Sequence, residues 1–187
     1  MAKSAQTATA ARVEPLAGRT GGAAGATVIP AKAAFRVSLR ADVADAAALS
    51  KSLGVKLPLE PKASAKSAKG RLALWLGPDE WLIIDETADP MADLAKCKSL
   101  HSAVDISHRN AALLVSGKGA RATLEAGCPR DLGESVFPVG AVSRTILGKI
   151  EVVIYRGSET EYRVEFWRSF SAYAFGFLNE AAKDCLV

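Results

Sequence analysis

The sequence predicts an α+β fold made of two ferredoxin-like split β-α-β modules that share one core. Strand-like runs alternate apolar and polar residues, helix-like runs carry an apolar stripe, and the order over residues 35–108 is β-α-β-β-α-β. The second half of the chain begins a similar series. The 187 residues are enough for two small modules, which we place at residues 34–108 and 109–187.

Residues 1–33 precede these modules and have a different composition. They are mostly Ala, Gly, Thr and Ser with scattered charge, and they offer little bulk to bury. We therefore expect an extended or disordered N-terminal arm. It is either a loose end or a segment that becomes ordered on a partner subunit, with four candidate anchors: Val13, Leu16, Val28 and Ile29.

Each element of the first module is predicted from its own stretch of sequence. In sequence we expect a strand at 35–40, a helix at 42–53, a mobile Lys/Ser/Ala loop at 61–70, strands at 71–77 and 80–86, a helix at 89–100 and a strand at 102–108. Asp42 and Asp89 are placed to cap the two helices, and Pro90 suits the first helical position.

The turn in LWLGPDEWLII, residues 74–84, resembles a functional cluster, with two tryptophans and two adjacent acids. Pro78 and Asp79 are typical of a tight turn between strands. Trp75 and Trp81 lie among aliphatic residues, which favours a role in the core or in a subunit contact. We interpret the stretch as structural.

The second module is expected to contain a strand at 111–117, a helix at 118–127, a loop at 128–140, a hairpin around Gly148, a strand at 161–167 and a helix from residue 169. Gly127 is expected to end its helix in the left-handed conformation, and Ser169 to cap the last helix. The expected apolar stripe of the last helix is Phe170, Tyr173, Ala174, Phe177, Leu178, Ala181, Ala182 and Cys185.

Charge and composition exclude several classes of protein. The pI is near 9.0, but residues 1–70 carry 11 Lys/Arg against 4 Asp/Glu, whereas residues 71–187 carry 13 against 16. The basic charge thus lies in the arm and a loop, which argues against nucleic-acid binding. There is no apolar run long enough for a membrane span and no secretory signal. Three widely spaced cysteines indicate a reduced, cytoplasmic protein without a zinc site or a disulfide framework.

Four motifs, LGPDEWLI, DISHRN, GCPRDL and SRTIL, occur here in this order, followed by WRSFSAYAFGFLNEAA. Together they resemble the gamma subunit of bacterial heterotetrameric sarcosine oxidase, from about Leu74 to Ala182. The resemblance implies a complex with alpha, beta and delta subunits that oxidatively demethylates sarcosine to glycine, forming hydrogen peroxide and 5,10-methylenetetrahydrofolate. It also implies that FAD, FMN, NAD and zinc are held by the partner subunits.

The same region is similar to the folate-binding domain of aminomethyltransferases. A strand ending in D-x-S-H and a V-x-G-x-x-A turn are matched by six residues: Asp105, Ser107, His108, Val115, Gly117 and Ala120. The paired aspartates of that family are replaced by Ile150 and Glu151. The loss of one carboxylate favours a retained fold that has lost catalysis.

Asp105, Ser107 and His108 also form the one candidate acid-base group. On a strand, Asp105 and Ser107 point to one side and His108 to the other, which is poor geometry for a proton relay. We expect no catalytic role for His108.

Two other segments resemble sites only locally. SGKG at 116–119 lacks the spacing of a phosphate-binding loop and is expected to be a strand-to-helix turn. Cys128 follows a helix C-terminus, which opposes ionisation of the thiol, so we expect a packed thiol.

Arg144 and Arg168 lie in apolar surroundings and require carboxylate partners, for which Asp131 and Asp105 are the candidates. The contact is either internal or with another subunit. The sequence thus predicts no catalytic, cofactor-binding or metal-binding residue in this chain. It favours a non-catalytic structural subunit, and the alternative is a stand-alone tetrahydrofolate-binding, aminomethyltransferase-like module that uses Glu151.

Overall fold

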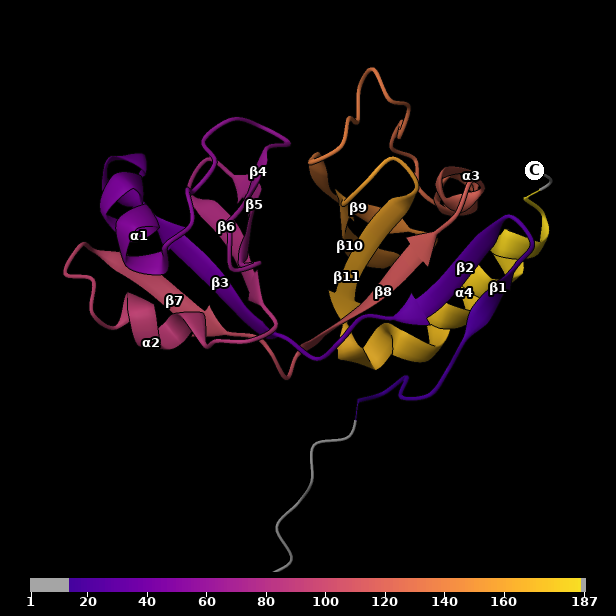
Figure 1. The fold of residues 1–187 in the computed structure, drawn as a ribbon, viewed down its shortest axis with the longest axis horizontal. Helices are drawn as coiled ribbons and strands as arrows, with labels where there is room; N and C mark the ends of the chain where they lie inside the picture. Colours follow the sequence, from indigo (N-terminus) through magenta and orange to yellow (C-terminus); the bar gives the residue numbers. More distant parts are fainter. Residues whose placement is uncertain (1–13, 186–187) are drawn as a thin grey trace, which may run out of the picture.

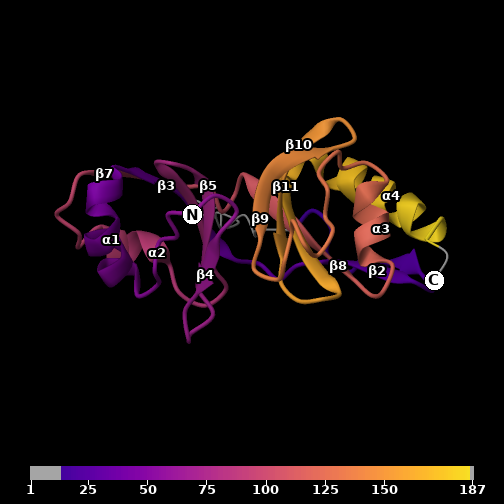
Figure 2. The same ribbon diagram turned by 90° about the horizontal axis from the view of Figure 1, so that it is seen from above.

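The computed structural model describes residues 14–185, which form two antiparallel sheets with helices on their outer sides (Figures 1 and 2). The five-stranded sheet contains β3 (Phe35–Ala41), β4 (Ser64–Lys66), β5 (Leu72–Gly77), β6 (Glu80–Asp85) and β7 (His101–Asp105). The six-stranded sheet contains β1 (Gly21–Ala23), β2 (Ala26–Pro30), β8 (Asn110–Ser116), β9 (Val142–Leu147), β10 (Ile150–Arg156) and β11 (Glu161–Trp167). The helices are η1 (Val43–Asp45), α1 (Ala46–Leu53), α2 (Pro90–Leu94), α3 (Ala120–Glu125), η2 (Arg168–Phe170) and α4 (Ser171–Lys183).

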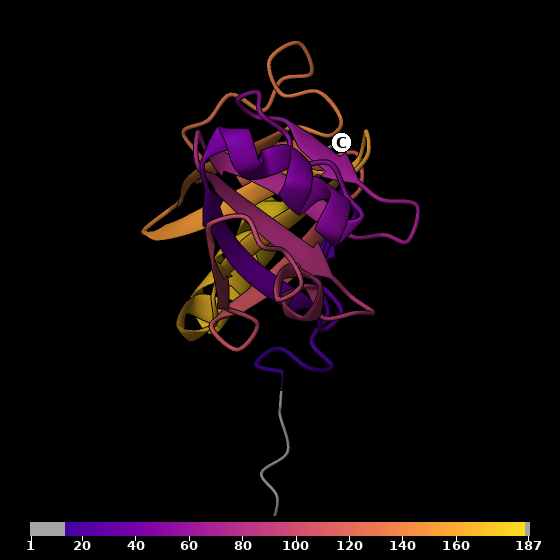
Figure 3. The ribbon, with the colours of Figure 1, turned by 90° about the vertical axis from the view of Figure 1, so that its left-hand side faces the viewer.

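The first sheet has the strand order β4-β5-β6-β3-β7, so its four long strands follow the order of a ferredoxin-like split unit. Asp42 accepts a hydrogen bond from the Ala44 N–H and Asp89 one from the Met91 N–H, which confirms both predicted caps. Figure 3 shows α1 in front of the strands, on the side away from the second sheet. The predicted loop at 61–70 contains β4, which pairs with β5.

The second sheet does not repeat this order. Its strands run β1-β2-β8-β11-β10-β9, because β9, β10 and β11 are joined by short turns and pair consecutively, leaving β8 between β11 and β2. The mixed α+β class with two antiparallel sheets is as predicted.

Part of the segment predicted as an extended or disordered arm is paired into the second sheet. Residues 21–30 form β1 and β2, and β2 pairs with β8, placing Val28 opposite Val115. Val28 and Leu16 are buried in the core of the second module. A free β8 edge would expose unpaired backbone groups, and β2 satisfies them. Residues 1–13, including Val13, lie outside the described residues.

Two details of the last helices differ from the predictions. α4 begins at Ser171, after η2, and has no side-chain cap, so Ser169 is not its cap. Phe175 is buried in the core while Tyr173 is exposed, because the helix is rotated from the predicted stripe.

Gly127, which follows α3, does not adopt the left-handed conformation predicted for it. A Cβ there would lie 2.3 Å from Cζ of Phe177, so glycine is required by that ring.

A shared core joins the inner faces of the two sheets. It is formed by eight residues from both modules: Ala34, Leu72, Leu74, Leu82, Ile84, Ile106, Val142 and Val153. The Val142 N–H also donates to the Lys62 carbonyl oxygen at 2.9 Å, and β5 and β9 lie side by side in Figures 1 and 2. A site between the modules would therefore be formed by residues on these inner faces.

Candidate functional site between the modules

The two tryptophans that flank the turn between β5 and β6 pack against core residues, as predicted. Trp81 is fully buried, and its Nε1–H donates to the Pro58 carbonyl oxygen at 2.7 Å. Trp75 is partly buried against the core between the sheets. Trp81 thus belongs to the core of the first module, and Trp75 contacts the core between the sheets.

Glu80, the first residue of β6, joins the two modules. Its carboxylate accepts hydrogen bonds from Arg40 of β3 at 2.9 Å and from Arg144 of β9 at 2.5 Å. Neither aspartate expected for Arg144 is its partner, because β9 lies beside β5 and brings the guanidinium to Glu80 instead. Asp131 accepts the Gly133 N–H within its own loop.

Asp105 and Ser107 stabilise the crossover from the first module to the second. Oδ1 of Asp105 accepts the Ser107 N–H at 2.8 Å and its hydroxyl at 2.5 Å. The Ser107 hydroxyl accepts the Arg36 N–H at 2.8 Å. His108 is exposed in the turn that follows. These contacts fix backbone positions, which is a structural role for the D-x-S-H pattern.

A buried charge network crosses between the sheets. Arg36 of β3 donates from Nε to Oε2 of Glu165 at 2.7 Å, and Arg163 donates from Nε to Oε1 of the same carboxylate at 2.8 Å. The side chains of Arg36 and Glu165 are only 3% and 1% exposed. One carboxylate from β11 thus neutralises part of the charge of two arginines, one from each module.

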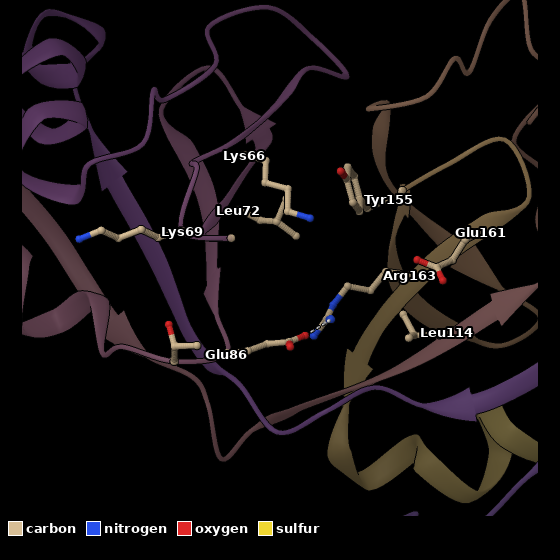
Figure 4. A pocket seen from close by; sticks show the side chains of 11 residues that line it. Lys66, Lys69, Leu72, Glu86, Leu114, Tyr155, Glu161 and Arg163 are labelled. Atoms are coloured by element: carbon tan, nitrogen blue, oxygen red, sulfur yellow. Dashed lines mark ion pairs between the residues drawn. The ribbon is translucent and has the colours of Figure 1, made fainter.

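Arg163 also faces a cavity of about 290 Å³ between the modules. Its Nη1 lies 3.5 Å from Oε1 of Glu86, while Nη2 is buried and has no hydrogen-bond partner among residues 14–185. Figure 4 shows Lys66 and Tyr155 on opposite walls of this cavity. Burial raises the pKa of the Tyr155 hydroxyl, which therefore remains a hydrogen-bond donor at neutral pH.

Ile150 and Glu151 lie on opposite faces of β10. Ile150 is buried in the core of the second module, whereas Glu151 is exposed on the inner face and lines a hollow of about 50 Å³. Glu80, Arg144 and Glu165 also line this hollow. Pockets for small organic ligands typically enclose about 300 to 1,000 Å³, so this hollow does not fit a pterin.

The remaining candidates are parts of the scaffold. Cys128 is buried, and its Sγ accepts the Arg130 N–H at 3.4 Å. Residues 116–119 form the predicted turn into α3, where Gly117 has φ 119°. The expected partner of Arg168 stays a prediction. Within residues 14–185 no group of three His, Cys, Asp or Glu could hold a metal ion, and no helix there is long and apolar enough to cross a membrane.

Sequence reasoning missed the charge network and the cavity beside it. Arg163 and Glu165 are two apart on a strand, so they share a face, and that face alternates with the apolar residues Val164 and Phe166. One face of this strand is apolar and the other carries charged residues. That pattern could have indicated a polar interface between two sheets.

Comparisons with known proteins identify the family to which this chain belongs. A sequence model described as "Sarcosine oxidase, gamma subunit family" matches residues 38–184. The chain belongs to the sarcosine oxidase gamma subunit family. This confirms the resemblance predicted from the four motifs.

Individual relatives of the gamma subunit family agree. The chain is 35% identical over 150 residues to a sarcosine oxidase subunit gamma of Arthrobacter sp, covering 77% of this chain and 74% of that protein. It is 32% identical over 141 residues to the subunit gamma of Corynebacterium sp. (strain P-1), covering 74% of this chain and 70% of that protein.

Two solved structures match most of this chain. A chain of heterotetrameric sarcosine oxidase from Corynebacterium sp. U-96, in complex with pyrrole 2-carboxylate, matches with a TM-score of 0.80 and 28% identity, covering 87% of this chain and 88% of that one. The glycine cleavage system aminomethyltransferase T from Bartonella henselae matches with a TM-score of 0.62 and 12% identity, over 86% of this chain and 50% of that one. This second match concerns the fold alone and agrees with the predicted resemblance to the aminomethyltransferase fold.

Proposed function

We propose that this chain is the non-catalytic gamma subunit of a heterotetrameric sarcosine oxidase and that it completes and stabilises the assembly. The observation that carries the proposal is the match to a chain of such a heterotetramer over 87% of this sequence, together with the family match over residues 38–184. The complex would oxidise sarcosine to glycine, with formation of hydrogen peroxide and 5,10-methylenetetrahydrofolate.

The inner faces of the sheets support this division of labour between the subunits. Where a folate-binding relative would place paired carboxylates, this chain has buried Ile150 and a hollow of about 50 Å³ beside Glu151. These features support a subunit without its own folate chemistry. In this proposal the alpha, beta and delta subunits of a cytoplasmic complex carry FAD, FMN, NAD and zinc.

Co-expression tests the proposal. The full chain with an affinity tag is expected to co-purify with three other subunits, identified by mass, and with flavin absorbance. Omission of the chain should lower the yield of assembled flavoprotein. Because the role is structural, assembled complexes carrying Glu151→Gln should keep sarcosine-dependent peroxide formation. Purification of the tagged chain without companions would contradict the subunit role, as would micromolar tetrahydrofolate binding by the isolated chain, which would favour the aminomethyltransferase-like alternative.

The outer face of α4 is the surface that best fits a subunit contact. It carries a hollow of about 530 Å³ lined by two acidic residues, Glu180 and Asp184, and by six uncharged ones: Ala126, Ala172, Tyr173, Gly176, Phe177 and Ala181. Apolar patches of this kind are typical of protein interfaces. In the assembly proposed above, a neighbouring subunit would cover this face.

Gly176 makes this contact testable without damage to the fold. A Cβ at Gly176 would have nothing within 4 Å, so Gly176→Arg should fold normally and project a charge into the hollow. We expect loss of co-purification with Gly176→Arg. Gly176→Ala is the matched control, because alanine favours the helix and adds one methyl group. Normal assembly with Gly176→Arg would move the contact elsewhere without affecting the proposed subunit role.

A further inference from the structure

The hollow on the outer face of α4 has walls of two chemical kinds. It lies where α4 passes Ala126, at the C-terminal end of α3, and the two helices lie side by side in Figure 2. One stripe of α4 lines most of it. Aromatic residues, Tyr173 and Phe177, come first along the helix, and acidic residues, Glu180 and Asp184, follow.

The aromatic wall is held in place from within the chain. Tyr173 and Phe177 stack with their ring centroids 6.1 Å apart, and the Tyr173 hydroxyl accepts the Lys149 N–H at 3.1 Å. A Cβ at Gly148 would clash with that hydroxyl, and one at Gly127 would clash with the Phe177 ring. Both rings thus occupy space that only glycine leaves. Groups fixed in this way lose little conformational freedom when a partner docks, which favours binding.

The floor of the hollow carries no side chain at Gly176. Glycine inside a helix is less stable than alanine, yet a Cβ at Gly176 would have nothing within 4 Å. No contact within residues 14–185 therefore requires glycine at this position. The missing side chain leaves room for a long side chain from outside to lie against the helix.

The acidic wall gives the hollow a negative charge. Glu180 and Asp184 line it together with uncharged residues only. Lys183, outside the lining, pairs with Glu180 at 2.7 Å, but these side chains are 55% and 70% exposed, so water replaces that contact at little cost. Asp184 makes no ion pair in the described part of the chain. It is the C-cap residue of α4, where the helix dipole disfavours an anion and favours a nearby cation.

We propose that an arginine side chain of a neighbouring subunit occupies this hollow. Its guanidinium pairs with the carboxylates of Glu180 and Asp184, and its aliphatic stem packs over Gly176 and against Phe177. Arginine suits both walls, because a guanidinium forms paired hydrogen bonds with carboxylates and stacks on aromatic rings. Gly176→Arg blocks this contact, because its side chain fills the same space from within the chain. The inference rests on the proposed subunit role, since the arginine belongs to a partner.

Subunit exchange in the assembled complex tests the two carboxylates. Complexes that contain a tagged chain are mixed with excess untagged natural chain, and the tagged chain that stays bound is measured over time. Asp184→Asn should be released about tenfold faster, as for loss of one hydrogen bond to a charged group. Glu180→Gln should have a smaller effect, because Lys183 already shares its charge. Asp184→Glu keeps the carboxylate and should retain most of the natural rate. Glu159→Gln, at an exposed carboxylate outside the hollow, is the matched control and should leave the rate unchanged.

Thermal unfolding separates binding from folding in these variants. Because a negative charge at a helix C-terminus is unfavourable, Asp184→Asn should unfold at no lower temperature than the natural chain. Release of the double variant Glu180→Gln, Asp184→Asn at the natural rate, or more slowly, would overturn the arginine and favour an apolar side chain as the occupant. If the natural chain entered no complex at all, the subunit role itself would be contradicted, and the partner arginine with it.

A pair of small molecules tests the guanidinium without any partner. The full chain is titrated at constant ionic strength with arginine amide and with citrulline amide, which has nearly the same shape but no charge on its side chain. The ring NMR signals of Tyr173 and Phe177 report occupancy of the hollow. We expect arginine amide alone to shift them, and the shift to disappear in the double variant. Equal responses to the two amides, including no response to either, would overturn the proposal even where the complex forms.

Discussion

Of the three ionic contacts that join the modules, Arg36–Glu165 and Arg144–Glu80 differ in burial far more than in distance. Arg36 and Glu165 lie 2.7 Å apart with side chains 3% and 1% exposed. Arg144 and Glu80 lie 2.5 Å apart, with side chains 36% and 13% exposed. An ion pair in contact with water contributes little because water solvates each charge when the pair is broken. A buried pair has no such substitute.

The difference indicates which contact fixes the orientation of the sheets. Arg36 lies on the inner face of β3 and Glu165 on the inner face of β11, next to the apolar residues shared by both sheets. Separating the modules would leave Arg36 without its carboxylate and Glu165 with Arg163 of its own strand as the remaining partner. The Arg144–Glu80 contact lies at the rim and can break and reform without that penalty.

The largest effect is expected from Glu165→Ala. This variant leaves the guanidinium groups of Arg36 and Arg163 buried and close to each other without their shared carboxylate. We expect a loss of about 3–5 kcal/mol in the free energy of unfolding, as for other buried charges deprived of a partner. Urea unfolding followed by circular dichroism measures it. Glu165→Gln keeps the shape and an acceptor oxygen, so it should lose less. A loss below about 1 kcal/mol for Glu165→Ala would contradict the importance assigned to burial.

The local parts of this comparison were predictable from the sequence, and the long-range parts were not. Alternation in FRVSLR and EYRVEFW identifies β3 and β11 and places Arg163 and Glu165 on one face. Arg36 and Glu165, however, are 129 positions apart, and alternation does not say which sheet faces which. The same limit explains the error for Arg144, whose partner Glu80 lies 64 positions away.

The N-terminal segment shows the limit of composition as a guide. Residues 21–30 are rich in Gly and Ala, which suggests little capacity to fold alone. Their order comes from β8, a strand more than 80 residues later that supplies hydrogen bonds to β2. Gly127 is a second example, because the need for glycine there depends on the ring of Phe177, which is distant in sequence.

A second buried cluster of charged residues lies inside the first module, and its contribution to stability depends on pH. Arg71 donates to Asp85 at 2.8 Å and to Asp93 at 2.9 Å. Burial alone would raise the pKa of Asp85, but hydrogen bonds from Thr87, Arg71 and Ala88 lower it to about 2. Because this pKa is below the ordinary 3.8, the stabilisation is complete above about pH 5 and is lost as the pH falls through 3.8 toward 2.

Asp85→Asn is therefore expected to flatten the acid side of the stability curve. Between pH 5 and 2 the natural chain should lose about 2 kcal/mol more in the free energy of unfolding than the variant does. Unfolding by urea at a series of pH values measures both slopes. Asp79→Asn, at a carboxylate whose side chain is 59% exposed, is the control and should leave the slope nearly unchanged. Parallel curves for Asp85→Asn and the natural chain would show that Asp85 does not gain its stability from ionisation.

The smallest effect is expected at the rim contact between the modules. Arg144→Ala should cost about 0.2–1 kcal/mol in the free energy of unfolding, the range of exposed ion pairs. The cost should shrink in 1 M NaCl, because salt screens charges that water reaches, whereas the cost of Glu165→Ala should persist. Glu80 keeps Arg40 as a second partner when Arg144 is removed, which also limits the loss. If Arg144→Ala proved as destabilising as Glu165→Ala, and equally insensitive to salt, burial would not be what separates the two contacts. The rim pair would then share in fixing the orientation of the sheets.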